Sequence, residues 1–331
     1  MRSPTLNELP PPPPGKTGWP WTEATLPAPA RMLDGRPWPR ISILTPSYNQ
    51  GQFIEETIRS VLLQGYEDLE FIIIDGGSSD QTIDVIKRYS IWLSYWTSEK
   101  DKGQSDALNK GLRFATGDIV AWVNTDDFYF PGVFNAVADA FAISERGRFW
   151  YMTAVNVIDL EDGRHEILKQ VEHGHLVDLL PLDRYVHSAG VFWSRVIAQR
   201  AGDFDVDLHF GFDKEYWMRL IDLGYIGIVD NSVISAAYRL HPASKTVSAN
   251  LYFRYEWAKI GLDYSKRAGV DETGVNQLKE QFIDTAIRLG CSASLSVKRR
   301  VMYLWECFLM NPSVLARRNW VSSVFRLLLG R

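Results

Sequence analysis

Apolar and polar positions between residues 41 and 124 predict strands separated by helices. The runs 41–48 and 69–75 are strand-length and strongly apolar, and the second ends in a carboxylate, which is typical of a buried parallel strand. Between them, apolar side chains recur at helical spacing over 53–63. The order then repeats, with helices predicted at 83–89 and 105–115 and strands at 91–99 and 117–124. Alternation of this kind indicates a mainly parallel sheet.

Polar residues gather where three of these strands end. They lie at 46–49, at 75–78 and at Asp126-Asp127. Because ligands on parallel sheets bind beyond the carboxyl ends of the strands, this pattern predicts a ligand site at that edge.

The rest of the chain is less regular. Strands are predicted at 148–159, 186–193, 226–229 and 232–238, an amphipathic helix at 213–223, and helices from 251 onward. The first forty residues are rich in proline and form no core of their own. Their tryptophans Trp19, Trp21 and Trp38 predict that this leader packs against the body.

Charge and composition narrow the class of protein. The net charge is −4, with 13 basic and 7 acidic residues after position 250, which leaves −10 in the first 250 residues. An acidic body argues against nucleic acid as the main partner. Cys291 and Cys307 cannot build a disulfide framework or a zinc finger. We find no apolar run long enough to span a membrane and no signal-peptide pattern at the N-terminus. The 12 tryptophans are an unexplained excess.

Three acidic positions are candidates for chemistry, each with a simpler alternative. Asp126-Asp127 could bind Mg²⁺ or Mn²⁺ together with substrate phosphate, or form a solvated turn. Asp75 could contact a ligand or cap a turn. Asp213 could act as a general base, or stabilise the first turn of a helix through the macrodipole. His187 and His241 are lone histidines, which are more often packed or surface residues.

The chain resembles family 2 glycosyltransferases of bacterial polysaccharide and O-antigen synthesis. The matching segments, in the family's order and spacing, are PRISILTPSYNQGQFIEETIRSVLLQGY (39–66), FIIIDGGSSDQT (71–82), SEKDKGQSDALNKG (98–111) and ATGDIVAWVNTDD (115–127). Weaker matches are GDFDVDLHFGFDKEYWMRL (202–220) and YRLHPASKT (238–246). One departure is Gly76, which stands where many members carry a second aspartate.

This resemblance implies an α/β GT-A fold, the nucleotide-diphospho-sugar transferase fold, with a mainly parallel central sheet and a helical C-terminal extension. The expected organisation is a leader at 1–38, a catalytic domain at 39–246 and a helical basic region at 247–331. Within the catalytic domain, 39–130 is the nucleotide-binding half and 131–246 the acceptor half.

The resemblance also implies a set of site residues. Asp213 is the catalytic base, and Asp127 and His241 are the ligands of Mn²⁺ or Mg²⁺. Thr45, Pro46 and Tyr48 line the nucleoside pocket, and Asp75 meets the base. The remaining donor-binding residues are Asp101, Gly103, Asn109, Asp126 and Lys245.

The predicted function is inverting transfer of a sugar from a nucleotide-sugar donor to an acceptor hydroxyl. The acceptor is a saccharide or a lipid-linked saccharide in the synthesis of cell-surface polysaccharide, O-antigen or glycolipid. A nucleotidyltransferase would need a Gly-rich basic loop after the first strand, which TPSYNQGQF lacks. A non-catalytic sugar-binding module would not need two carboxylate clusters at strand ends. On this reading Trp193 and Trp217, in the acceptor half, can stack on sugars.

The C-terminal region has two open interpretations. Apolar residues recur at helical spacing from Val297 to Leu309, among basic residues. A basic amphipathic helix can lie on an anionic membrane, and the alternative is a helical pair docked on the catalytic domain. We therefore expect a cytoplasmic protein, with peripheral contact to the inner face of the cell membrane under the first interpretation. The basic residues concerned are Lys298, Arg299, Arg300, Arg317, Arg318 and Arg326.

Overall fold

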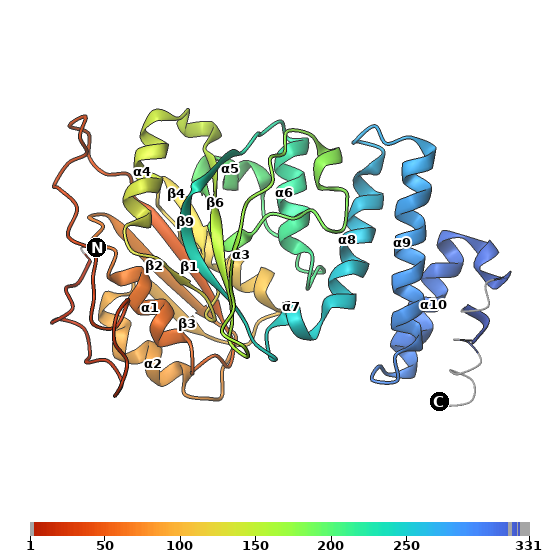
Figure 1. Cartoon of the computed structure of the whole chain (residues 1–331), viewed down its shortest axis with the longest axis horizontal. Coiled ribbons are helices and arrows are strands. Elements are labelled where there is room, and N and C mark those ends of the chain that lie inside the picture. Colours follow the sequence, from red (N-terminus) through yellow and green to blue (C-terminus); the bar gives the residue numbers. More distant parts are fainter. Residues whose placement is uncertain (1–2, 317–319, 323, 325–331) are drawn as a thin grey trace. The chain divides into compact units, whose positions relative to one another are not determined.

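The structure is a computed structural model that describes residues 3–316, 320–322 and 324 (Figure 1). The described residues fall into two compact units. The first lies within Met1–Gly174 and Val186–His241, and the second within His175–Tyr185 and Pro242–Arg331. Each unit is described by itself below.

Four parallel strands form one half of the sheet in the first unit, in the order β3-β2-β1-β4. They are β1 (Ile41–Ser47), β2 (Leu69–Asp75), β3 (Tyr95–Ser98) and β4 (Ile119–Trp122). The helices between them are α1 (Ile54–Leu62), α2 (Thr82–Tyr89) and α3 (Gln104–Phe114). The predicted alternation of strands and helices is confirmed, except that 91–99 begins with a 3₁₀ turn, η1 (Ser90–Trp92).

The other half of the sheet is mixed. β8 (Val191–Ser194) pairs antiparallel with both β4 and β6 (Trp150–Asp159), and β6 runs parallel to β9 (Ile228–Leu240). β9 joins the two strands predicted at 226–229 and 232–238, with register shifts against β6 between them. The first part of the strand predicted at 186–193 is instead the 3₁₀ turn η4 (Ser188–Gly190). The shorter strands and helices of this half are β5 (Phe128–Tyr129), β7 (His165–Leu168), α4 (Val133–Ile143), α5 (Arg195–Ala201) and α6 (Phe212–Asp222).

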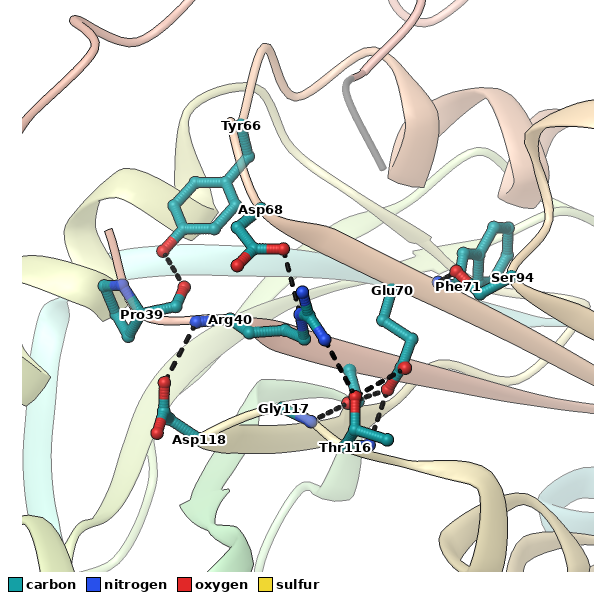
Figure 2. A network of polar contacts seen from close by, with 11 residues as sticks. Pro39, Arg40, Tyr66, Asp68, Glu70, Phe71, Ser94, Thr116, Gly117 and Asp118 are labelled. Carbon is teal, nitrogen blue, oxygen red and sulfur yellow. Dashed lines mark hydrogen bonds and ion pairs between the residues drawn. The ribbon is translucent and has the colours of Figure 1, made fainter. Parts of the chain in front are cut away.

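A polar network joins the amino-terminal ends of the parallel strands (Figure 2). Arg40 precedes β1 and donates to Asp68 before β2 (2.9 Å) and to Thr116 before β4 (3.1 Å). Glu70 on β2 accepts from Ser42 on β1 (2.5 Å) and from both the amide and the hydroxyl of Thr116 (2.7 and 2.8 Å). These bonds link the strands at the edge opposite their carboxyl ends, so the register that places the candidate site residues is held from the far side.

The Pro-rich leader packs against the first unit, as predicted. Arg59 on α1 is completely buried, and its guanidinium donates to the carbonyls of Pro10 (2.8 Å), Pro20 (3.0 Å) and Trp21 (2.9 Å). The Trp19 indole donates to the Tyr129 carbonyl (2.7 Å). Figure 1 shows the leader as extended chain beside the sheet and its helices. Because an extended segment makes few backbone hydrogen bonds of its own, the Arg59 guanidinium supplies the donors that its carbonyls need.

The tryptophan excess has a mainly structural explanation. Trp193 and Trp217 have no exposed surface, so the expectation that they stack on sugars is wrong. They belong to an aromatic core with Trp122 and Trp150, in which the Trp217 ring stacks on Trp122 (5.5 Å between centroids, 5° between planes) and on Trp150 (5.7 Å, 19°). The strand 148–159 and the helix 213–223 were predicted separately, and their packing against each other is what buries these rings.

The second unit is helical. Its helices are α7 (Lys245–Ser248), α8 (Asn250–Ser265), α9 (Glu272–Cys291) and α10 (Val297–Met310), with the 3₁₀ turns η3 (Leu176–Leu179) and η5 (Pro312–Ala316). Its core draws on α8, α9 and α10, with Phe282, Ile283 and Cys307 among its most buried members. None of the helices that the structure describes has the length and apolar character needed to cross a membrane.

The two faces of α10 differ. One face is buried and includes Arg300, whose guanidinium Nε donates to the Gly290 carbonyl (3.0 Å). Arg300 was expected among the basic residues that would face a membrane, but its side chain is buried within the unit. Arg317, Arg318 and Arg326 lie outside the described residues. The other face exposes an apolar stripe, defined as Val297, Val301, Met302, Trp305 and Leu309, of which Trp305 is 57% and Leu309 63% exposed.

Candidate active site

The last residue of β2 is tied to the loop that follows it and to the last residue of β3, at the carboxyl edge of the sheet. The buried Asp75 carboxylate accepts from the backbone amides of Gly77 (3.0 Å) and Ser78 (2.8 Å) and from the hydroxyls of Ser78 (2.5 Å) and Ser98 (2.7 Å). In the structure Asp75 therefore caps the turn that follows β2, which is the simpler of its two predicted roles. Its predicted contact with a nucleotide base stays a prediction.

Gly76 and Asp101 approach each other closely at this edge. A Cβ added to Gly76 would lie 2.7 Å from the Asp101 carboxylate, so the space of a side chain at 76 is filled by Asp101. The Asp101 carboxylate accepts from the Gly103 amide (2.9 Å), and partial burial raises its pKa. Gly103 itself has φ of +121°, a conformation that glycine adopts most readily, immediately before α3. A carboxylate from the loop after β3 therefore occupies the space that a side chain at position 76 would take.

The loop after β4 holds two aspartates in different environments. Asp127 has no exposed surface, and its carboxylate oxygens accept from the Arg239 amide (2.9 Å) and from the Asn124 side chain (3.3 Å). Burial, followed by the neighbouring Asp126 charge, raises the Asp127 pKa well above its usual range. The Asp126 side chain is 18% exposed. Of the two carboxylates, Asp126 is therefore the one with some exposed surface.

The end of β9 brings His241 to Asp126. The His241 Nε2 lies 3.2 Å from the Asp126 carboxylate, and its ring packs on Phe53 (4.8 Å between centroids). Arg239, two residues earlier, donates from Nε to the Asp126 carbonyl and pairs with Glu56 on α1 (2.5 Å). Arg239 thereby fixes both the backbone of the aspartate loop and the end of the strand that carries His241.

A divalent ion fits the chemistry of this pair. Carboxylate oxygen and imidazole nitrogen are both ligands of Mn²⁺, and Mg²⁺ or Mn²⁺ sites commonly use few protein ligands and complete their shell with substrate phosphates and water. Within residues 3–316, 320–322 and 324, no group of three or more His, Cys, Asp or Glu side chains is arranged to hold a metal alone. The geometry places His241 beside Asp126, whereas the expected ligand Asp127 is enclosed.

Asp213 lies in the first turn of α6. Its side chain is partly exposed, and its carboxylate accepts from the Ser188 hydroxyl (3.0 Å) and from the Lys214 amide (2.8 Å). Burial raises the pKa of Asp213, and the bonds from Lys214 and Ser188 act against that rise. The Trp122 ring, at the end of β4, packs against the rings of Phe212 (6.4 Å between centroids) and Trp217 (5.5 Å between centroids) of α6. α6 therefore packs against the strand that precedes the aspartate loop.

Asn109 links α3 to the loop before α6. Its buried amide donates to the Phe204 carbonyl (2.8 Å) and accepts from the Phe204 amide (2.8 Å). The side chain that was expected along the donor thus forms a backbone clamp, and its contact with a donor stays a prediction.

The other predicted donor residues are placed as follows. Thr45 and Pro46 are buried within β1, whereas Tyr48 is 60% exposed just after it. Lys245 begins α7 in the second unit, so its assignment stays a prediction. Sequence reasoning missed Ser188, Arg239 and Gln104, which donates to the Asn124 side chain (2.7 Å). Hydroxyl, amide and guanidinium groups at single positions carry no spacing signal by which to find them.

Comparisons with known proteins agree with this fold. Residues 42–152 match the sequence profile of glycosyl transferase family 2. An uncharacterized glycosyltransferase of Mycobacterium tuberculosis (strain H37Rv) is 30% identical over 189 residues, which cover 55% of this chain and 68% of the relative. Residues 1–349 of Staphylococcus aureus TarS, crystallised with UDP-GlcNAc, superpose with a TM-score of 0.57 at 18% identity, over 82% of this chain and 81% of that one. In a longer TarS chain the match covers 49% of its length.

A second solved structure adds a metal-bound relative. The mannosyltransferase PcManGT from Pyrobaculum calidifontis, in complex with GDP-Man and Mn²⁺, superposes with a TM-score of 0.52 at 18% identity, over 88% of this chain and 90% of that one. The fold is the GT-A fold of glycosyltransferases, as expected. The chain belongs to glycosyl transferase family 2.

Proposed function

We propose that this glycosyltransferase transfers a sugar from a nucleotide-sugar donor to an acceptor hydroxyl with inversion at the anomeric carbon. The observation that carries the proposal is the pairing of Asp126 with His241 beyond β4, on the sheet edge that also holds Asp75 and Asp101. Support for the donor class comes from related folds that bind UDP-GlcNAc and GDP-Man.

Asp126 and His241 are the proposed protein ligands of Mn²⁺ or Mg²⁺, in place of the expected pair Asp127 and His241. A divalent ion bound there would offset the negative charge that the leaving nucleoside diphosphate gains. Asp127 then has a supporting role. Its carboxylate accepts from the Arg239 amide, and this bond fixes the backbone next to Asp126. The exposed Tyr48 and the carboxylate of Asp101 are the proposed contacts of the nucleoside and sugar, and Lys245 is the proposed basic contact of the diphosphate.

Asp213 is the proposed catalytic base. It takes the proton of the acceptor hydroxyl as that oxygen attacks the anomeric carbon on the face opposite the leaving diphosphate. A carboxylate with a raised pKa is a stronger base than an exposed one, and Asp213 meets that condition because burial disfavours its charged form.

The test is a transfer assay over a panel of nucleotide sugars and saccharide acceptors with Mn²⁺, in which released nucleoside diphosphate and product are both measured. Asp213→Asn should retain donor binding and lose transfer, and Asp126→Asn should lose metal-dependent donor binding. The anomeric proton coupling of the product reports the stereochemistry. Product of retained configuration, or near-normal transfer by Asp213→Asn, would contradict the mechanism.

The proposed acceptor is a saccharide or lipid-linked saccharide of cell-surface polysaccharide, O-antigen or glycolipid synthesis, reached at an anionic membrane surface. The apolar stripe of α10 supports this, because Lys298 and Arg299 are exposed on the same helix and complement anionic headgroups. In flotation with phosphatidylglycerol vesicles, Trp305→Ser combined with Leu309→Ser should reduce binding. Ile143→Ser, at an exposed apolar position of the first unit, is the matched control. Equal binding by all three proteins would refute the membrane contact.

A further inference from the structure

Two hydrogen bonds lead from the aromatic core to the Asp213 carboxylate. The Trp217 indole Nε1–H donates to the Ser188 hydroxyl oxygen (3.3 Å), and the Ser188 hydroxyl donates to Asp213 Oδ2 (3.0 Å). The other carboxylate oxygen, Oδ1, accepts from the Lys214 amide (2.8 Å). Both oxygens of the proposed base are therefore held by groups that belong to the protein.

The chemistry of the three groups fixes the direction of these bonds. An indole N–H donates and has no acceptor atom, and an ionised carboxylate accepts only. Ser188 must therefore accept from Trp217 and give its single proton to Asp213. A hydroxyl constrained in this way favours the ionised form of the carboxylate.

The indole end of the relay is rigidly packed. Trp217 has no exposed surface and stacks on Trp122 and Trp150. Trp122 is the last residue of β4, the strand that leads to Asp126. The aromatic core thus gives the base and the aspartate loop a common support.

The hydroxyl end is also fixed. The Gln170 side chain accepts from the His187 amide (3.0 Å) and donates to the carbonyls of His187 (2.9 Å) and Thr153 (3.0 Å). At Gly190 an added Cβ would lie 2.4 Å from the Thr153 carbonyl oxygen, so the turn η4 is pressed against β6. These contacts hold the backbone of Ser188 on both sides.

We propose that Ser188 and Trp217 form a positioning relay that holds the Asp213 carboxylate in one orientation and keeps it ionised for proton abstraction. The relay rests on the proposed role of Asp213 and adds two residues to it. Ser188 acts through Asp213 and does not itself contact the reacting atoms.

Lys214 and His187 are titratable neighbours of the relay, and their effects must be distinguished from those of Ser188. Lys214 follows Asp213 and is buried, and its positive charge favours the ionised carboxylate in the wild type and in Ser188 variants alike. His187 precedes Ser188, and burial lowers its pKa to about 4. A direct measurement on the aspartate carboxyl carbon avoids confusion with either group.

The experiment is NMR titration of the full chain labelled with ¹³C at aspartate Cγ and ¹⁵N at tryptophan. Asp213→Asn and Trp217→Phe identify the two signals. In Ser188→Ala the pKa of Asp213 should rise by about one unit, and the Trp217 indole signal should stop following that titration. Ser188→Thr, which keeps the hydroxyl, should restore both. Ser144→Ala, which removes a hydroxyl bonded to the Phe141 carbonyl at the end of α4, should leave both unchanged.

Transfer kinetics give the second readout. Ser188→Ala should lower kcat about tenfold on the acid limb of the pH profile, where the raised pKa leaves less of the Asp213 carboxylate ionised, so that this limb moves to higher pH with unchanged donor KM. An unchanged Asp213 pKa in Ser188→Ala, or a Trp217 signal that never follows Asp213, would overturn the relay while an inactive Asp213→Asn still supports the base. An active Asp213→Asn would overturn the base and the relay together.

Discussion

Replacing Arg59 with methionine tests how the leader is held. The guanidinium is completely buried, and the carbonyls of Pro20 and Trp21 that it binds are buried with it. Methionine fills similar space but leaves both carbonyls without their donor, at about 1–3 kcal/mol each. The expected loss is about 2–5 kcal/mol, near the cost of breaking a buried charged contact.

This free energy should appear first as opening of the leader, because Arg59 is its main polar attachment to α1. A loss of at least about 2 kcal/mol raises the open population about thirtyfold or more. Trypsin cleavage at Lys16 and Arg31, followed by mass spectrometry, measures that population when reclosing is fast. Arg88→Met is the matched control, since Arg88 is largely exposed and its pair with Glu55 is worth about 0–1 kcal/mol. If Arg59→Met is cleaved no faster than Arg88→Met, the inferred role of the buried arginine is refuted.

Three further predictions concern the site. Asn109→Ala removes both bonds to the Phe204 backbone and should destabilise the chain by about 2–4 kcal/mol in thermal or urea unfolding; a change below about 0.5 kcal/mol would disprove the clamp. Gly76→Ala should displace the Asp101 carboxylate and weaken UDP or GDP binding about tenfold by calorimetry, and equal affinity would show that the close approach is unimportant. Because burial raises the Asp213 pKa and the base acts when ionised, kcat should rise with pH through that raised pKa and then level off; a rate that falls over the same range would contradict the base.

Local signals in the sequence were sufficient for the parallel half of the sheet. β1, β2 and α1 follow apolar runs and helical spacing that neighbouring residues define on their own. The mixed half depends on pairings between distant segments, such as β6 with β9, so two predicted strands proved to be one. Trp193 and Trp217 were misplaced for the same reason, because burial of a ring depends on which elements pack around it.

The acidic positions of the site were found from the sequence, but their environments were not. Asp126 and Asp127 are adjacent, and nothing in the sequence indicates that one is more buried than the other. The difference arises from Arg239 and His241, more than 110 residues later, which bind Asp127 and approach Asp126 respectively. The contact between Gly76 and Asp101 also depends on distant segments. These residues follow β2 and β3, and only the pairing of the two strands brings them together.

The most direct test of the account is Mn²⁺ binding in the presence of UDP or GDP, followed by electron paramagnetic resonance. Asp126→Asn should weaken nucleotide-dependent Mn²⁺ binding at least tenfold, corresponding to about 1.4 kcal/mol. Asp118→Asn, at the opposite edge of the sheet, should bind as the wild type does. Wild-type Mn²⁺ affinity in Asp126→Asn would contradict the proposed metal centre, and with it the assignment of this edge as the donor site.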